Sequence, residues 1–257
     1  MMRVGLLILV GWLGGCAFSP AGDGPPVRDQ RIPNANVTPR PEPRSASGNP
    51  PFYEVYGIRY YVMEDAADYR ERGVASWYGK KFHGRPTSSG EPFDMHAVSA
   101  AHKTLPLPTW VRVTHLGNGR SIVLRVNDRG PFVDNRLIDL SYAAARELDL
   151  IEAGTGLVEV EAIRFDTPSA STAVERTPVA LLYMQVGAFG ELANATRLRD
   201  RIDKTVAQNV FVASDTSRQP AIHRVRVGPI ASVADFDRIS GQLRALGVDE
   251  VRLVNED

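Results

Sequence analysis

The chain has 257 residues, enough for one large domain or for two small ones that each bury a core. Lysine plus arginine and aspartate plus glutamate both number 30, so the formal net charge is zero. This balance gives no electrostatic reason to expect nucleic acid as a partner, because such binding calls for a clustered basic face. Hydrophobic residues make up 43% of the chain, which is ordinary for a globular protein.

The beginning of the chain has the order of a secretory signal, with positive charge in Met1-Met2-Arg3 and then the apolar stretch Val4–Leu13. That stretch has about half of the ~20 residues that a membrane-spanning helix needs. Leu13-Gly14-Gly15-Cys16 resembles a bacterial lipobox, which implies cleavage before Cys16 and its acylation as a membrane anchor. Ala17, where Asp would signal retention at the inner membrane, favours the outer membrane. The alternative is a plain signal peptide with an incidental cysteine.

Residues 17–51 are rich in Pro, Gly, Asn and Ser and have almost no apolar pattern, so we predict a disordered tether. Residues 52–72 are expected to lead into the first domain. They hold the aromatic side chains Phe52, Tyr53, Tyr56, Tyr60 and Tyr61.

Short apolar runs, several of them alternating, predict a mostly β domain over residues 73–165. The runs are Val74–Tyr78, Ala97–Ala101, Val111–His115, Ile122–Val126 and Leu157–Phe165. Gly117-Asn118-Gly119-Arg120 predicts a hairpin between two of them, because Asn and Gly tolerate positive φ. Ser141 is expected to cap a helix over 142–148. Several short strands in about 90 residues favour a small closed barrel.

Residues 166–178 read as a linker containing Pro, Ser and Thr, and the domain predicted over 179–255 repeats itself at a spacing of 41 residues. The repeat aligns apolar residues of the two halves: Leu192, Ala195, Leu198 and Ile202 with Val233, Phe236, Ile239 and Leu243. It also aligns Val186-Gly187 with Val227-Gly228, and Val210 and Val212 with Val251 and Leu253. Each half has the pattern strand, helix, strand. We therefore predict an α+β, ferredoxin-like βαββαβ domain whose sheet has one face free for binding.

The first domain carries motifs that resemble the rare lipoprotein A family. They are Ala75–Gly79, Lys81–Arg85, Gly90–Met95, Ala100–Pro106 and Val126–Pro131. The family's fold is an all-β double-psi β-barrel, similar to those of expansins and membrane-bound lytic transglycosylase A. Tyr183–Phe189 and Arg224–Pro229 resemble the SPOR domain, which binds septal glycan strands stripped of their peptides.

The resemblance implies a lytic transglycosylase without a cofactor, in which Asp128 is the acid and base that cleaves the glycan to 1,6-anhydro-muramic ends. Glu91 and His102 match two further functional positions. Glu91 is expected to raise the pKa of Asp128 by like-charge repulsion, and His102 to orient a carboxylate or a sugar hydroxyl. Each residue also has a structural alternative. Asp128 could be an ordinary turn residue, Glu91 a solvated charge on a loop, and His102 a structural histidine whose nitrogens are hydrogen-bonded within the protein. The loop Thr87–Gly90 departs from the family's usual Thr-Ala-Asn-Gly but leaves Glu91 in frame.

Other polar and aromatic residues of the barrel could serve either in sugar binding or in the structure. Trp77 and Tyr78 are candidates for stacking on a sugar ring, with core packing as the alternative. His83 and His96 are expected to be structural or rim residues. Because no metal-ligand spacing such as His-Glu-x-x-His occurs, we expect no metal.

In the SPOR-like domain, Gln185 and Arg224 match positions that line the family's glycan face, and the alternative is an ordinary polar strand face. Ile222 and Ala188 stand where some relatives carry an aromatic residue and a serine. These departures concern individual contacts and leave the expected role of the domain unchanged.

The resemblance places the protein at the periplasmic face of the outer membrane, lipid-anchored through Cys16 and enriched at the division septum. Its expected partners are peptide-free glycan strands, the membrane and proteins of the division machinery. One competing hypothesis is a binding protein that loosens polysaccharide without cutting it, as expansins do. Another makes the SPOR-like domain the main effector, which recruits the chain to the septum.

Overall fold

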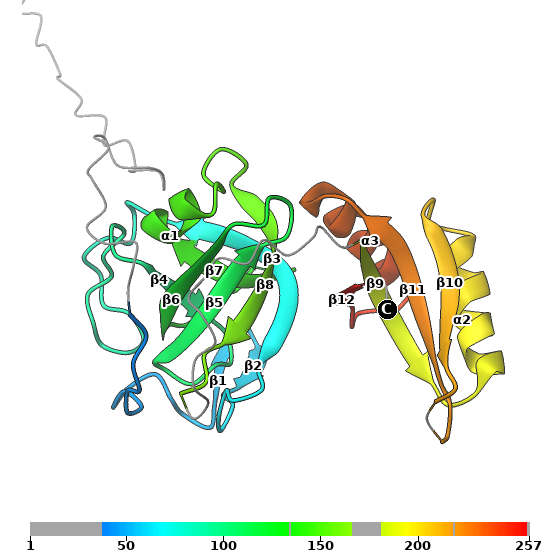
Figure 1. Cartoon of the computed structure of the whole chain (residues 1–257), viewed down its shortest axis with the longest axis horizontal. Helices are drawn as coiled ribbons and strands as arrows, with labels where there is room; N and C mark the ends of the chain where they lie inside the picture. Colours follow the sequence, from blue (N-terminus) through cyan, green and yellow to red (C-terminus); the bar gives the residue numbers. More distant parts are fainter. Residues whose placement is uncertain (1–37, 134, 166–180, 218, 256–257) are drawn as a thin grey trace, which may run out of the picture.

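The computed structural model describes residues 38–133, 135–165, 181–217 and 219–255. Two folded units lie side by side: a barrel and a smaller sheet with helices (Figure 1). The predicted signal, Cys16 and the whole of the predicted linker lie outside the described residues. In the described part of the chain, no helix is both long and apolar enough to cross a membrane.

The first unit is a closed six-stranded barrel in the order β3-β7-β4-β6-β5-β8. Its strands are β3 (Arg70–Tyr78), β4 (Ser99–His102), β5 (Thr109–His115), β6 (Ser121–Asp128), β7 (Arg136–Ser141) and β8 (Thr155–Ala162). The pairs β3–β7 and β4–β6 are parallel, and the remaining pairs are antiparallel. The double-psi β-barrel expected from the sequence is therefore confirmed.

Two local predictions in the barrel are confirmed in detail. The β5–β6 hairpin turns at Asn118 and Gly119, where Gly119 has φ +72° and the Asn118 side chain accepts from Arg120 N–H at 2.9 Å. Helix α1 (Tyr142–Glu147) begins after Ser141, whose hydroxyl accepts from Ala144 N–H. The alanines of α1 are fully buried against the barrel, so the helix closes one side of the core.

The second unit is a four-stranded antiparallel sheet in the order β10-β11-β9-β12. Its elements are β9 (Leu182–Phe189), α2 (Leu192–Asp203), β10 (Asn209–Asp215), β11 (Ile222–Ile230), α3 (Val233–Ala245) and β12 (Arg252–Asn255). The two helices begin 41 residues apart, and their apolar faces pack in one cluster with alternate residues of the strands. The predicted repeat and the βαββαβ order are confirmed.

The segment before the barrel is more ordered than predicted. Phe52–Val55 and Ile58–Tyr61 form a hairpin, β1–β2. Before it, Asn49 exchanges two hydrogen bonds of 2.7 Å with the backbone of Leu107, and Ser45 N–H donates to the same carbonyl. The prediction of a disordered tether is therefore wrong for residues 38–51, because this polar segment is held by hydrogen bonds that composition does not reveal.

The two units share an apolar contact. Val74 of β3 and Leu157 of β8 belong to the same buried cluster as the core of the second unit. Strand β12 lies next to β3 in this contact (Figure 1).

Candidate functional site

Strand β6 ends at the rim of the barrel. One extra residue near this end changes the direction in which the last side chains of the strand point. Along β6, Leu124 and Val126 point inward and are fully buried. Opposite β4, Ala100 pairs with Val126 but Ala101 pairs with Asp128, so Asn127 is the extra residue of a bulge. Strict alternation would put Asp128 inside the barrel with Val126. The bulge instead leaves Asp128 half-buried at the rim.

One carboxylate oxygen of Asp128 is fixed by three donors. Oδ1 accepts from the Ser88 N–H, the Ser88 hydroxyl and the Arg129 N–H, each at 2.8 Å. Among the described residues, no hydrogen bond engages Oδ2. The arrangement holds the carboxyl group in one orientation and leaves Oδ2 as the oxygen that can carry or accept a proton.

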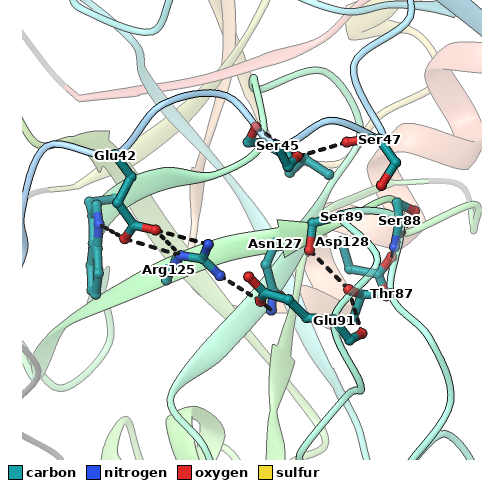
Figure 2. Close-up of polar contacts among 12 residues, drawn as sticks. Glu42, Ser45, Ser47, Thr87, Ser88, Ser89, Glu91, Arg125, Asn127 and Asp128 are labelled. Atoms are coloured by element: carbon teal, nitrogen blue, oxygen red, sulfur yellow. Dashed lines mark hydrogen bonds and ion pairs between the residues drawn. The ribbon is translucent and has the colours of Figure 1, made fainter.

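Glu91 comes from the loop that also supplies Ser88, and it lies at the same rim (Figure 2). Its Oε2 accepts from Arg125 Nη1 at 2.6 Å and from Asn127 Nδ2 at 3.0 Å. Arg125 also binds Glu42, with Nη2 to Oε2 at 3.0 Å, and Trp110 Nε1 donates to the same carboxylate at 2.8 Å. Arg125 is therefore shared between two carboxylates from distant parts of the chain.

The hydrogen bond from Arg125 lowers the pKa of Glu91, although partial burial opposes the shift, and the Asn127 amide acts in the same direction as Arg125. Glu91 is thus ionised at neutral pH. Among the described residues, the Glu91 carboxylate is hydrogen-bonded to Arg125 and Asn127 rather than to Asp128. The sequence suggested that Glu91 acts mainly by like-charge repulsion of Asp128. In the structure, the main interaction of Glu91 is instead its ion pair with Arg125.

Arg125→Gln is expected to raise the pKa of Glu91 towards its ordinary value, because the largest cause of the depression is removed. An NMR titration of the Glu91 side-chain carboxyl carbon measures the shift. Arg120→Gln is the control, since the ion pair of Arg120 is with Asp149. An unchanged Glu91 titration in Arg125→Gln would contradict the assignment.

His102 does not have the role that the sequence suggested. The side chain is 2% exposed. Nδ1 accepts from the backbone N–H groups of Thr104 and Leu105, which leaves Nε2 as the protonated nitrogen, 2.8 Å from the Tyr69 hydroxyl. Both ring nitrogens are therefore engaged away from Asp128 and Glu91, and the ring is not available to orient a sugar hydroxyl. Its position one residue beyond Ala101 makes it a buried support of the rim.

The aromatic candidates of the barrel pack mainly within the protein. Tyr78 is 7% exposed and stacks on Phe93 with ring centroids 4.1 Å apart, so its ring does not present a face to a sugar. Trp77 is partly buried, with its ring edge-on to Tyr142. His83 accepts from the Met95 N–H and contacts the ring of His96. Within the described residues, no group of three or more His, Cys, Asp or Glu is arranged to hold a metal ion.

Gln185 and Arg224 lie on the sheet face opposite the helices of the second unit. Met184, Val186 and Val225 point into the core, so their neighbours Gln185 and Arg224 point the other way. Arg224 also lies 3.6 Å from Asp215 in an ion pair. The geometry agrees with the face predicted for these two residues.

A surface hollow of about 480 Å³ adjoins Glu91. It is lined by Thr38, Arg40, Glu42, Glu91, Trp110 and Arg125. A larger hollow of about 880 Å³ lies between the barrel and β12 and includes neither Asp128 nor Glu91. We take the hollow beside Glu91 as part of the site, since it adjoins the fixed carboxylates.

Sequence reasoning missed Ser88, Arg125, Arg129 and Glu42. The alternation of β6 would have put Arg125 on the outer face, but its partner Glu42 is 83 residues away. Ser88 falls where the loop departs from the family's usual sequence, and that departure was the available signal.

The family profile described as "Lytic transglycolase" matches residues 70–160, and the profile of the SPOR domain matches residues 180–252. The endolytic peptidoglycan transglycosylase RlpA of Pseudomonas aeruginosa strain UCBPP-PA14 is 38% identical over 93% of this chain and 86% of its own length. The protein of the same name from Vibrio cholerae is 36% identical over 97% of this chain and 96% of its own length. A crystal structure of the RlpA SPOR domain from P. aeruginosa is 35% identical, covers 29% of this chain and 99% of that one, and has a TM-score of 0.28.

Both profiles fall on the units seen in the structure, and the P. aeruginosa and V. cholerae proteins named RlpA match along nearly the whole chain. This chain belongs to the RlpA family, with a double-psi β-barrel followed by a SPOR domain.

Proposed function

We propose that the chain is an endolytic peptidoglycan lytic transglycosylase that cleaves the β-1,4 bond between N-acetylmuramic acid and N-acetylglucosamine in peptide-free glycan. Family membership supports the reaction class. The observation that carries the assignment of the residues is Asp128, a rim carboxyl group with Oδ1 fixed by three donors and Oδ2 without a described partner.

One carboxyl group suffices for this reaction. Asp128 donates its proton to the glycosidic oxygen as the bond to the anomeric carbon of the muramic acid breaks. The 6-hydroxyl of the same sugar then forms a bond to that carbon, and its proton passes to the carboxylate of Asp128. The products are a free 4-hydroxyl on the leaving sugar and a 1,6-anhydro ring, and the acid is regenerated.

Glu91 supplies a negative charge at the same rim. Its Arg125 partner keeps the carboxylate ionised, while its side chain is 45% exposed and faces the hollow. An ionised carboxylate there stabilises the positive charge that develops at the anomeric carbon in the transition state. His102 acts indirectly, as a buried support for the strand end beside Asp128.

The second domain holds the enzyme on its substrate. Gln185 and Arg224 present amide and guanidinium donors on one sheet face, which suits the hydroxyl and acetamido groups of glycan. Acylated Cys16 anchors the chain at the periplasmic face of the outer membrane, and the SPOR domain concentrates it at the septum, near proteins of the division machinery.

Mass spectrometry of soluble products tests the reaction. The full chain in detergent is incubated with peptide-stripped sacculi, and the ends of the released glycans are identified. We expect 1,6-anhydro ends. Reducing ends would make the enzyme a hydrolase, and no release with sacculus binding retained would favour an expansin-like binding protein.

The double variant Gln185→Ala/Arg224→Ala is expected to weaken binding to peptide-free sacculi by about tenfold to a hundredfold, because hydrogen bonds that include a charged group are lost. Co-sedimentation measures the dissociation constant. Cleavage of short soluble glycans, which depends on the barrel, stays unchanged. Arg201→Ala, an exposed arginine on helix α2, is the control on the opposite face and should bind like wild type. Equal binding by the double variant would remove this face from the substrate site.

A further inference from the structure

Two arginines on either side of Asp128 hold the same segment of chain. This segment, residues 42–49, is called the strap. Arg125 binds Glu42, with Nε 3.2 Å from both carboxylate oxygens and Nη2 3.0 Å from Oε2. Arg129 donates from Nη2 and Nε to the Gly48 carbonyl at 2.7 and 3.0 Å. The strap is thus tied down at both ends. Figure 2 shows the end at Glu42, where the carboxylate meets Arg125.

The contacts of the strap are built into the barrel. The side chains of Glu42 and Arg125 are only 18% and 19% exposed, and Trp110 donates to the same carboxylate. Nη1 of Arg129 also donates to the carbonyl of His102, the last residue of β4, and to the carbonyl of Leu105 in the segment that follows. Partly buried charges with several hydrogen bonds hold one geometry, whereas an exposed ion pair does not.

The strap also lies directly on the loop that carries Glu91 and supplies the Ser88 donors of Asp128. Gly48 has φ +81°, and a Cβ added there would come within 2.6 Å of the Ser88 carbonyl oxygen. At Gly90, an added Cβ would lie 3.3 Å from Ser47 Oγ. Ser88 donates to Asp128, and Glu91 follows Gly90. A shift of the strap therefore moves the donors of Asp128 and the backbone of Glu91 together.

We propose that the strap is a positioning element of the active site, with Glu42 and Gly48 as its positioning residues. Glu42 fixes the orientation of Arg125, so that Nη1 points at Glu91. Gly48 lets the strap approach Ser88 closely enough to keep its N–H and hydroxyl on Asp128. This inference rests on the proposed reaction, and it extends the functional barrel to a segment that precedes the matched profile at residue 70.

The first test replaces Gly48 with alanine in the full chain. We expect kcat on soluble peptide-free glycan to fall by about tenfold to a hundredfold, because the added methyl displaces Ser88. KM stays within about twofold, since Gly48 does not line the hollow beside Glu91. Gly57→Ala is the matched control: Gly57 has φ +78°, so the backbone strain is alike, but nothing lies within 4 Å of its added Cβ.

The outcomes separate the strap from the reaction itself. If Gly48→Ala retains the kcat of Gly57→Ala, the strap does not position the site. If Gly48→Ala is as active as Gly57→Ala while Asp128→Asn is inactive in the same assay, the strap proposal fails and the proposed role of Asp128 stands. If Asp128→Asn cleaves at the wild-type rate, the proposed role of Asp128 fails.

The second test replaces Glu42 and remains informative if the Gly48→Ala variant folds poorly. Glu42→Ala removes the carboxylate that orients Arg125, so the hydrogen bond from Arg125 Nη1 to Glu91 changes and the acid limb of the pH profile of kcat shifts. Glu42→Gln retains an acceptor for Trp110 and Arg125 and should restore most of the wild-type profile. Glu54→Ala removes an exposed ion pair with Arg59 and is the control. Coincident profiles for Glu42→Ala and Glu54→Ala would overturn the proposal.

Discussion

Asp128→Asn is expected to lower the rate of release of anhydro-ended glycan by at least about a hundredfold, and up to ten-thousand-fold, which is the range for loss of a general acid. Asparagine keeps an acceptor oxygen for the Ser88 and Arg129 donors, so the rim keeps its geometry. The amide nitrogen then stands in place of Oδ2 and cannot donate a proton to a leaving oxygen and recover it. Timed mass spectrometry of soluble products measures the loss.

Asp94→Asn provides the matched control. Asp94 is another aspartate near the rim loops, 55% exposed, whose Oδ1 accepts from the His96 N–H. We expect its cleavage rate and sacculus binding to equal those of wild type. Binding of Asp128→Asn to sacculi should also be unchanged, because the SPOR domain is intact. Wild-type release of anhydro ends by Asp128→Asn would exclude Asp128 as the acid.

His102 is expected to make the protein sensitive to acid. Burial, with smaller effects from Arg129 and Lys103, lowers the pKa of His102 from 6.5 to about 3. Because the unfolded chain takes up this proton at a higher pH than the folded chain, the stabilising contribution is complete above pH 6.5 and is lost as the pH falls towards 3. Between pH 7 and pH 4, protonation of His102 in the unfolded chain lowers the free energy of unfolding by roughly 3 kcal/mol.

Chemical unfolding of His102→Asn at pH 7 and pH 4 tests this. The asparagine oxygen can accept from the Thr104 and Leu105 N–H groups in place of Nδ1 but does not titrate. The variant is expected to be less stable at pH 7, since the contact with Tyr69 is lost, yet to lose less stability on acidification. His83→Asn is the control, because the exposed His83 also accepts a backbone N–H through Nδ1. Equal acid losses in wild type and His102→Asn would refute the prediction.

Predictions from the sequence succeeded where the determining contacts are local. The turn at Asn118 and Gly119, the cap at Ser141 and the apolar spacing within each of helices α2 and α3 all follow from residues within a few positions of each other. Strand β7 was not predicted, and neither was the β1–β2 hairpin, although its pairing is local. Strand β7 is held by pairing with two strands distant in sequence, and such pairing overrides weak local preference.

The site was predictable only in part for the same reason. Resemblance to a family identified Asp128 and Glu91, and the structure brings them to one rim. The bulge at Asn127 that turns Asp128 outward depends on the register between β4 and β6. Burial likewise decides His102: its residue type allows proton transfer, but packing around it leaves a neutral ring.

The closure of the barrel also bears on how such proteins are assembled in evolution. Its first and last strands, β3 and β8, are antiparallel neighbours, and Arg70 lies opposite Glu161. The chain therefore enters and leaves the barrel at adjacent points on one end. A fold whose ends emerge together can be inserted between other modules, or gain a different carboxy-terminal partner, without rearrangement of its own strands.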